Sequence, residues 1–128
     1  MTDQGSVVVR IPADPANVPL LRTTVAGVGA RQAFTIEQLD DLRMGVEEAA
    51  VLLLRRGIGE PIELHLDVLT DGLALRLSTP ATGSEPPVDT TSFSWVILTA
   101  LADDVEARLD DGIALIRLAK YRGEDLPA

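Results

Sequence analysis

The chain has 128 residues, of which 46% are hydrophobic and 24% charged, which is typical of one globular domain rather than a disordered segment. It has no apolar run long enough to span a membrane, and no cysteine for a disulfide or a thiolate site. The net charge of −9 argues against direct nucleic-acid binding, because phosphate repels an acidic surface. The same acidity fits either solubility or a basic protein partner. The sequence MTDQGSVVVR lacks the layout of a signal peptide, so we expect a cytoplasmic protein without membrane association.

The first two predicted elements are a strand and a helix. The β-branched run over 6–13 predicts a strand that ends near a proline. A helix is expected over 14–31, beginning through Asp14 or Asn17. Pro19 suits its first turn, where a missing backbone N–H costs nothing.

The clearest helix signal covers residues 34–57. Thr35 followed three residues later by Gln38 forms a capping box, and Gly57 is a natural C-terminal stop. Between them, apolar residues recur at the helical period and define the face expected to enter the core: Leu39, Leu42, Val46, Ala49, Ala50 and Leu53.

The second half of the chain predicts two hairpins separated by a loop and a short helix. The alternating runs 61–69 and 73–78 form the first hairpin, which turns at Thr70-Asp71-Gly72. One face of these strands is apolar and the other polar, so helices are expected to cover one side of the sheet. A loop over 79–91 leads to a helix over 92–104.

The second hairpin is expected over 105–121, turning at Asp110-Asp111-Gly112, before a polar tail over 122–128. The order β-α-α-β-β-α-β-β indicates an α+β two-layer sandwich, and no linker divides residues 1–128 into separate domains.

A search for catalytic groups finds few candidates. The chain has one histidine, His65, and Glu63 and Asp67 flank it on the same strand face at a spacing that could hold a metal. A solvated surface strand explains the same pattern, and this interpretation is favoured. The sequence contains no Walker loop and no G-x-G-x-x-G.

Three stretches suggest a family: NVPLLRTTVAGVGA, LRMGVEEAAVLLLRRG and SFSWVILTALADDVEARLDDGIALIRLAK. Through them the chain resembles, over roughly residues 6–121, the bacterial RsbW-type anti-sigma factors, with closest similarity to the UsfX-like subgroup. The resemblance implies the GHKL (Bergerat) ATPase fold, a mixed, mainly antiparallel sheet covered by helices on one face. It also implies a homodimer.

The nucleotide-binding motifs of this family are altered here. The family's N-box has a general-base glutamate and, four residues later, a magnesium-binding asparagine; the matching residues are Glu48 and Leu52. A leucine cannot ligate magnesium. The adenine-reading aspartate is replaced by Ser78 or Thr79.

The family's phosphate-binding Gly-x-Gly is replaced by Ser92-Phe93-Ser94. We therefore expect no resident metal or cofactor, with ATP and Mg²⁺ relevant only through this degenerate pocket, and no kinase activity. Phe93 and Trp95 either pack in the core or fill the vacant pocket, and the sequence favours filling.

The first helix keeps Asn17 and Arg22 at the spacing found in the family. In related anti-sigma factors an arginine at this position contacts both the sigma factor and the anti-anti-sigma factor, although an ordinary exposed helix arginine fits the same pattern. The resemblance thus implies an anti-sigma factor that sequesters a stress- or sporulation-type sigma factor and is countered by an anti-anti-sigma (STAS-domain) partner. Two alternatives remain open: an active serine-protein kinase that phosphorylates that partner, and a small-ligand sensor on the same fold.

Overall fold

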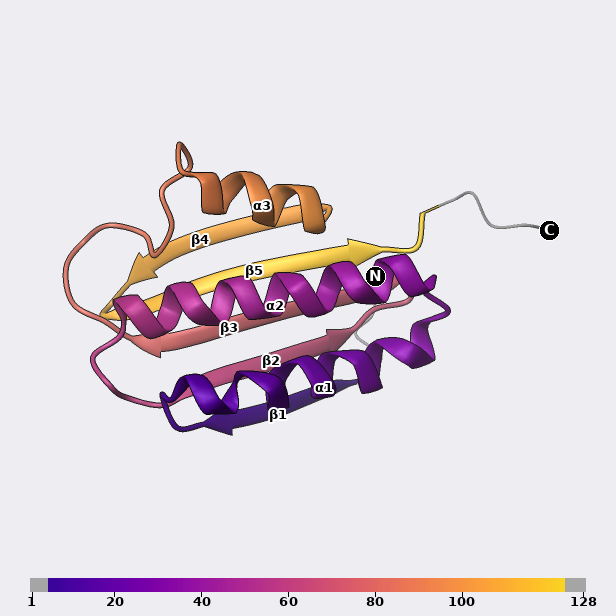
Figure 1. Ribbon diagram of the computed structural model, residues 1–128, viewed down its shortest axis with the longest axis horizontal. Coiled ribbons are helices and arrows are strands. Elements are labelled where there is room, and N and C mark those ends of the chain that lie inside the picture. The colour runs from indigo at the N-terminus through magenta and orange to yellow at the C-terminus, as the bar shows by residue number, and fades with distance from the viewer. Residues whose placement is uncertain (1–4, 124–128) are drawn as a thin grey trace.

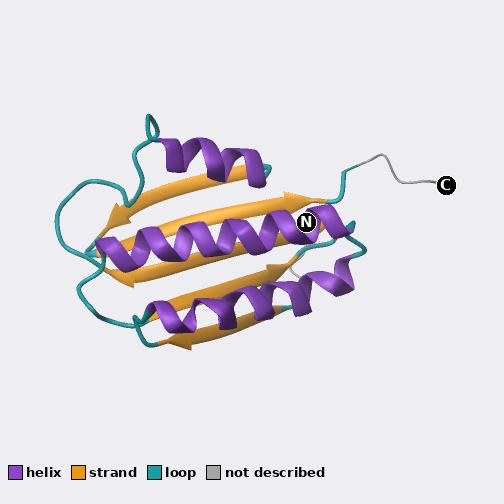
Figure 2. Ribbon diagram, in the orientation of Figure 1, coloured by secondary structure: helices purple, strands orange, loops and turns teal. Residues whose placement is uncertain are grey.

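A computed structural model describes residues 5–123 as one five-stranded sheet with helices on a single face (Figures 1 and 2). The strand order is β1-β2-β3-β5-β4, and all four pairings are antiparallel. The strands are β1 (Ser6–Ile11), β2 (Ile62–Val68), β3 (Gly72–Pro80), β4 (Asp104–Asp110) and β5 (Ile113–Tyr121). The predicted α+β two-layer sandwich is confirmed, and the described sheet is antiparallel throughout rather than mixed.

The helical layer follows the strands across the sheet. Helix α1 (Val18–Gly29) lies over β1 and β2, α2 (Ile36–Arg56) over β3 and β5, and α3 (Phe93–Leu101) beside β4 (Figure 1). Short 3₁₀ turns precede and follow α1, at Pro15–Asn17 and Ala30–Gln32. No helix within residues 5–123 has the length and apolarity to cross a membrane.

The core lies between the two layers. Every second residue of the central strands faces the helices, which bury Leu64, Leu66, Leu73, Leu75, Leu77, Ile116 and Leu118 to 1% exposure or less. The core face of α2 is the predicted one: Leu42, Val46, Ala49, Ala50 and Leu53 are buried, and Leu39 is half-buried. Period-2 strands and a period-3.6 helix thus supply the two apolar surfaces that meet.

The predicted capping box of α2 is present. Thr35 Oγ1 accepts a hydrogen bond from Gln38 N at 3.1 Å, and Gln38 Oε1 accepts one from Thr35 N at 2.9 Å. The start of the preceding helix differs from the prediction over 14–31. Asp14 caps the first 3₁₀ turn by accepting a hydrogen bond from Ala16 N, whereas Asn17 makes no capping bond.

The two hairpins turn in different ways. Asp111 and Gly112 have φ of 51° and 77°, the left-handed conformation expected of an Asp-Gly turn. The first hairpin turns at the predicted residues, but Asp71 and Gly72 do not adopt the positive φ that an Asp-Gly turn tolerates. Gly72 is instead required for close packing, because a Cβ there would lie 2.1 Å from the backbone oxygen of Lys120.

The predicted boundaries hold to within a few residues. Helix α3 ends at Leu101 rather than at 104, because Asp104 already begins β4. The polar tail predicted over 122–128 lies, from residue 124 onward, outside the described residues.

Candidate functional site

The region that corresponds to the family's nucleotide pocket involves α2, the end of β3 and the start of α3. Glu48 and Leu52 lie one turn apart on α2, so they share a helix side as predicted. Glu48 is half-buried and has no hydrogen-bond or ion-pair partner for its carboxylate among residues 5–123. Leu52 packs against the hydrophobic core. The side chain at the magnesium-binding position therefore contributes to packing and offers no oxygen ligand.

The alternation of β3 separates the two candidates for the adenine-reading position. Ser78 pairs in register with Glu63 and lines a shallow groove with Arg10 on the uncovered face of the sheet. Thr79 lies on the helix-covered face and is 2% exposed. Its hydroxyl donates to the backbone oxygens of Glu60 and Pro61, both at 3.1 Å. Of the two residues, Thr79 is thus the one that faces α2, and it holds the chain segment before β2.

Ser92 and Ser94, which the resemblance matches to the family's glycine pair, lie at the start of α3. Ser92 is the N-cap residue, and its hydroxyl accepts a hydrogen bond from Trp95 N at 3.2 Å. Ser94, the third residue of the Ser92-Phe93-Ser94 stretch, is half-buried in the first turn of α3. A capping serine satisfies a backbone donor that a phosphate would otherwise meet at a helix N-terminus.

The aromatic residues of this stretch do not fill a vacant pocket. Phe93 is 77% exposed, so the predicted filling role is wrong for it. Trp95 is half-buried and packs against the main core. The reason is helical geometry, because residues two apart on a helix point in different directions and only one of them can face the sheet.

The loop between β3 and α3 is held against the end of α2 by Arg56. The Arg56 guanidinium donates to the backbone oxygens of Thr82, Glu85 and Pro86, the last at 2.8 Å. Val88, further along the loop, is 5% exposed and belongs to the core. The loop thus closes over this end of the molecule by its own contacts.

Asp89 completes the approach to α3. Its carboxylate accepts hydrogen bonds from the backbone N–H and the hydroxyl of Thr91, both at 2.8 Å. The backbone bond first, and then the hydroxyl bond, lower the pKa of Asp89 below its usual value. Asp89 therefore stays ionised beside the N-terminus of α3.

The strand residues considered as metal ligands diverge. His65 Nε2 lies 2.8 Å from Glu63 Oε1, whereas Asp67 forms an ion pair with Arg76 at 3.3 Å. Within residues 5–123 no three metal-ligating side chains come together. The geometry favours the surface-strand interpretation for these three residues.

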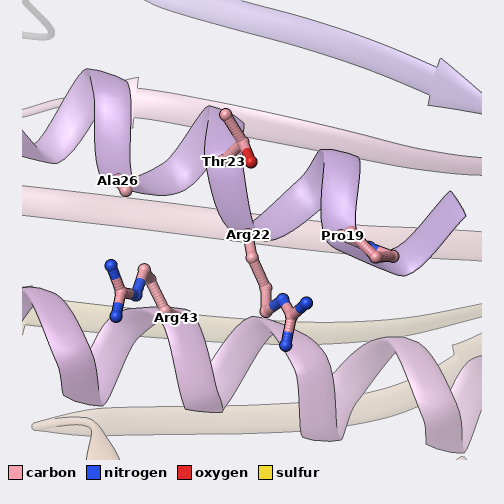
Figure 3. Close-up of a pocket in the computed structure, with 5 residues that line it drawn as sticks. All are labelled: Pro19, Arg22, Thr23, Ala26 and Arg43. Carbon is pink, nitrogen blue, oxygen red and sulfur yellow. The ribbon is translucent and has the colours of Figure 1, made fainter.

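A groove between α1 and α2 contains the predicted partner residue Arg22. It has a volume of about 480 Å³ and is lined by Pro19, Arg22, Thr23, Ala26 and Arg43. In Figure 3, Arg22 reaches from α1 towards α2, and Arg43 extends from α2 towards α1. Arg22 Nη1 donates a hydrogen bond to Glu47 Oε1 at 3.0 Å. The two side chains remain exposed, at 42% for Arg22 and 46% for Glu47.

Asn17, the second predicted partner residue, does not line this groove. Its side-chain amide donates to the backbone oxygen of Pro12 at 3.2 Å and so holds the connection from β1 to α1. Sequence reasoning missed Arg43 and the role of Arg56. The spacing of Asp40 and Arg43, three residues apart, predicts an ion pair on the helix surface, and the two side chains do pair at 2.8 Å. Nothing in the sequence shows that Arg43 faces α1.

Comparison with curated proteins finds RsbW sequences. The chain is 33% identical to the anti-sigma-F factor RsbW of Mycobacterium tuberculosis H37Rv over 102 residues, 79% of this chain and 60% of the relative. The chain thus spans less than two thirds of that relative's length. It is 26% identical to the serine-protein kinase RsbW of Oceanobacillus iheyensis, with 98% of this chain and 92% of the relative aligned. No protein-family model matches the chain.

Among solved structures, the crystal structure of the RsbU and RsbW domains of a Mycobacterium tuberculosis protein superposes with a TM-score of 0.75. The match covers 98% of this chain and 34% of the other, at 11% identity, and it establishes a shared fold. The predicted resemblance to RsbW proteins is therefore confirmed by homologues of that name and by a structure that contains an RsbW domain.

Proposed function

We propose that the chain is an anti-sigma factor that sequesters its sigma factor by stoichiometric binding, with Arg22 as an anchor of the interface. The observation that carries this proposal is the position of Arg22 in an open groove between α1 and α2, held by one exposed ion pair to Glu47. Exposed ion pairs contribute little stability, so a partner's carboxylate can replace Glu47 at small cost. The planar guanidinium binds a carboxylate through two parallel hydrogen bonds, which suits an interface anchor.

The proposal includes no kinase activity. Phosphoryl transfer requires a held metal ion and a cradle for the phosphates. Leu52 packs on the core at the metal-binding position, and Ser92 caps α3 at the phosphate-binding position. Arg56 holds the intervening loop closed. These contacts support sigma binding that does not depend on nucleotide.

The names of several relatives favour one alternative, an active serine-protein kinase. Calorimetric titration with ATP and Mg²⁺ separates the two functions. We expect no heat of binding at millimolar ATP. Tight ATP binding, together with phosphate transfer to an anti-anti-sigma protein, would establish the kinase and refute our proposal.

Release of the sigma factor is assigned to competition by an anti-anti-sigma protein of the STAS type at the Arg22 surface. A homodimer is part of the same proposal, as the resemblance implies. Sedimentation analysis of the free chain measures the dimer directly. Titrating a purified STAS protein into the sigma complex measures competition, and undisturbed complex at saturating STAS protein would exclude this route of release.

The test of the anchor compares Arg22→Ala with two further variants in a binding assay against the purified sigma factors of the source organism. Arg22→Ala should weaken binding at least ~30-fold, the effect of an interface hot spot of about 2 kcal/mol. Arg31→Ala, an exposed arginine beyond the other end of α1, is the matched control and should bind normally.

Glu47→Gln distinguishes an interface role from a structural one. If Arg22 serves the partner, removing its internal competitor should leave binding unchanged or tighter. If the Arg22–Glu47 pair only fixes α1 against α2, then Glu47→Gln and Arg22→Ala should weaken binding alike. That second result would contradict the assignment of Arg22.

A further inference from the structure

Helix α3 leaves one of its apolar faces uncovered. Its sequence, FSWVILTAL, contains no charged residue. Leu98 is buried and Trp95 packs against the core, but Phe93 is 77% and Val96 56% exposed, and Ala100 is also exposed. Residues at these spacings, three and four apart, lie along one side of a helix. Together they form an exposed apolar stripe along the helix, which we call the α3 face.

Acidic groups flank the α3 face at both ends. The chain from residue 77 to residue 107 contains no Lys or Arg and five acidic residues. Two of the five, Asp104 and Glu106, point to the helix-free face of the sheet, because Val105 and Ala107 pack on the core. Asp89 precedes α3 and Asp103 follows it directly, and both are exposed. The surface therefore combines an apolar centre with an acidic rim.

Glu106 is paired with Arg108, but within residues 5–123 no ion pair involves Asp89 or Asp103. Lys120 forms an ion pair with Asp41 and donates to the backbone oxygen of Leu101. Arg56 is engaged by the carbonyl groups of the loop. Arg55 is exposed in the last turn of α2, so the rim is acidic on balance rather than uniformly.

The charge of the rim selects among the molecules that could cover the α3 face. A second copy that paired its own α3 across a two-fold axis would bring like charges together, with Asp103 against Asp89 in an antiparallel pair and against Asp103 of the other copy in a parallel pair. An anionic membrane or nucleic acid would be repelled. A protein segment with an apolar face flanked by Lys and Arg matches both the centre and the rim.

A sigma factor has such segments for a physical reason. It recognises promoter DNA, and DNA-binding surfaces carry Lys and Arg that neutralise phosphates. We propose that the α3 face, formed by Phe93, Val96 and Ala100, is a second docking surface, which covers an apolar, basic-flanked segment of the sigma factor. This inference rests on the proposed function.

The α3 face and the Arg22 groove lie apart on the molecule. Helix α1 lies over one edge of the sheet and α3 over the other, with α2 between them (Figure 1). The two surfaces would therefore hold different parts of the sigma factor. The Arg22 groove accepts a carboxylate, and the α3 face accepts basic and apolar groups that would otherwise contact DNA.

The test measures binding of the purified sigma factors of the source organism to the full chain by surface plasmon resonance. Phe93→Ser combined with Val96→Ser should weaken binding at least tenfold, mainly through faster dissociation. Both side chains are exposed, so the variant should keep its melting temperature. Ile36→Ser is the matched control, because Ile36 is 78% exposed at the start of α2, and it should bind as the wild type does.

Neutralising the rim tests the charge argument. Asp89→Asn with Asp103→Asn keeps the acceptors for the backbone N–H groups of Thr91 and Tyr121. This variant should slow association and flatten its dependence on salt concentration. An unchanged association rate would contradict a basic occupant.

The outcomes separate this inference from the proposed function. If the wild type binds a sigma factor and the Phe93→Ser, Val96→Ser variant binds it equally well, the α3 face is not a docking surface, and the proposed function stands. If the wild type binds no sigma factor, both fail. If the same variant turns a dimer into a monomer in sedimentation, a second copy covers α3 and our inference is overturned.

Discussion

Replacing Thr79 tests whether the adenine-reading position has become a structural one. Its side chain is 2% exposed, and its hydroxyl donates to the backbone oxygens of Glu60 and Pro61, each at 3.1 Å. Thr79→Val keeps the shape and removes the donor. We expect it to lower the free energy of unfolding by about 1–2 kcal/mol, the cost of one lost hydrogen bond with acceptors left unpaired.

Thr79→Asp, which restores the family's residue type, should cost more. It would place a carboxylate against two carbonyl oxygens in a site that excludes water, and both features disfavour its charged form. The penalty has a ceiling, because the group can take up a proton instead. At neutral pH, protonating a carboxyl whose ordinary pKa is near 3.9 costs about 4 kcal/mol. We therefore expect a loss of about 3–4 kcal/mol at pH 7.

The pH dependence of this variant has a definite sign. A carboxyl whose pKa is raised by folding binds more protons in the folded than in the unfolded state, so stability falls as pH rises above the unfolded value. In urea denaturation at about pH 3.5, the free energy of unfolding of Thr79→Asp should be close to that of the wild type at the same pH. At pH 7 the variant should show the full loss. Thr79→Ser, which keeps the donor, is the control. Equal stability of the Asp and Val variants at pH 7 would refute this reasoning.

Three further predictions concern other parts of the fold. The hydrogen bond from the single tyrosine, Tyr121, to Asp104 raises the phenol pKa above 10.0, so the free energy of unfolding should fall as pH rises beyond that value. Asp104→Asn should lower the phenol pKa measured by ultraviolet titration, and an unchanged titration would contradict the contact. Gly72→Ala should lower the free energy of unfolding by about 2–3 kcal/mol in urea denaturation, because the new Cβ meets a backbone oxygen. Gly27→Ala is the control and should not destabilise the protein, since a Cβ there has nothing within 4 Å. Equal effects of the two changes would argue against close packing at Gly72. Arg56→Ala should speed amide hydrogen exchange over residues 82–91, and unchanged exchange would show that the loop does not depend on Arg56.

The parts of the fold that were predictable depend on local rules. Thr35 and Gln38 specify the start of α2 through a reciprocal pair of hydrogen bonds, and both partners lie within four residues of each other. The alternation of β2 and β3 fixes which side chains face the helices, because a strand has period two. The positive φ of Asp111 and Gly112 follows from the same local logic.

The parts that were not predictable depend on contacts distant in sequence. Gly72 is required by the neighbouring strand at Lys120, not by its own turn, and no local pattern carries that information. The choice between Ser78 and Thr79 is different, because the alternation of Leu73, Leu75 and Leu77 already places Thr79 on the helix-covered face. The exposure of Phe93 depends on how α3 is rotated against β4, which Trp95 and Leu98 determine by packing inward.

Under the proposed function, the contacts made at the positions matched to the nucleotide motifs would make ATP binding difficult to gain by single substitutions. Leu52 contributes to the core, Thr79 clamps the segment before β2, Ser92 caps α3, and Arg56 holds the loop. Leu52, Thr79 and Ser92 each make a contact within the fold, so placing the family's residue at any one of these positions removes a structural contact without completing a nucleotide site. Under the proposed function, control over the sigma factor would then act through the exposed surfaces, with Arg22 and the α3 face on opposite sides of α2.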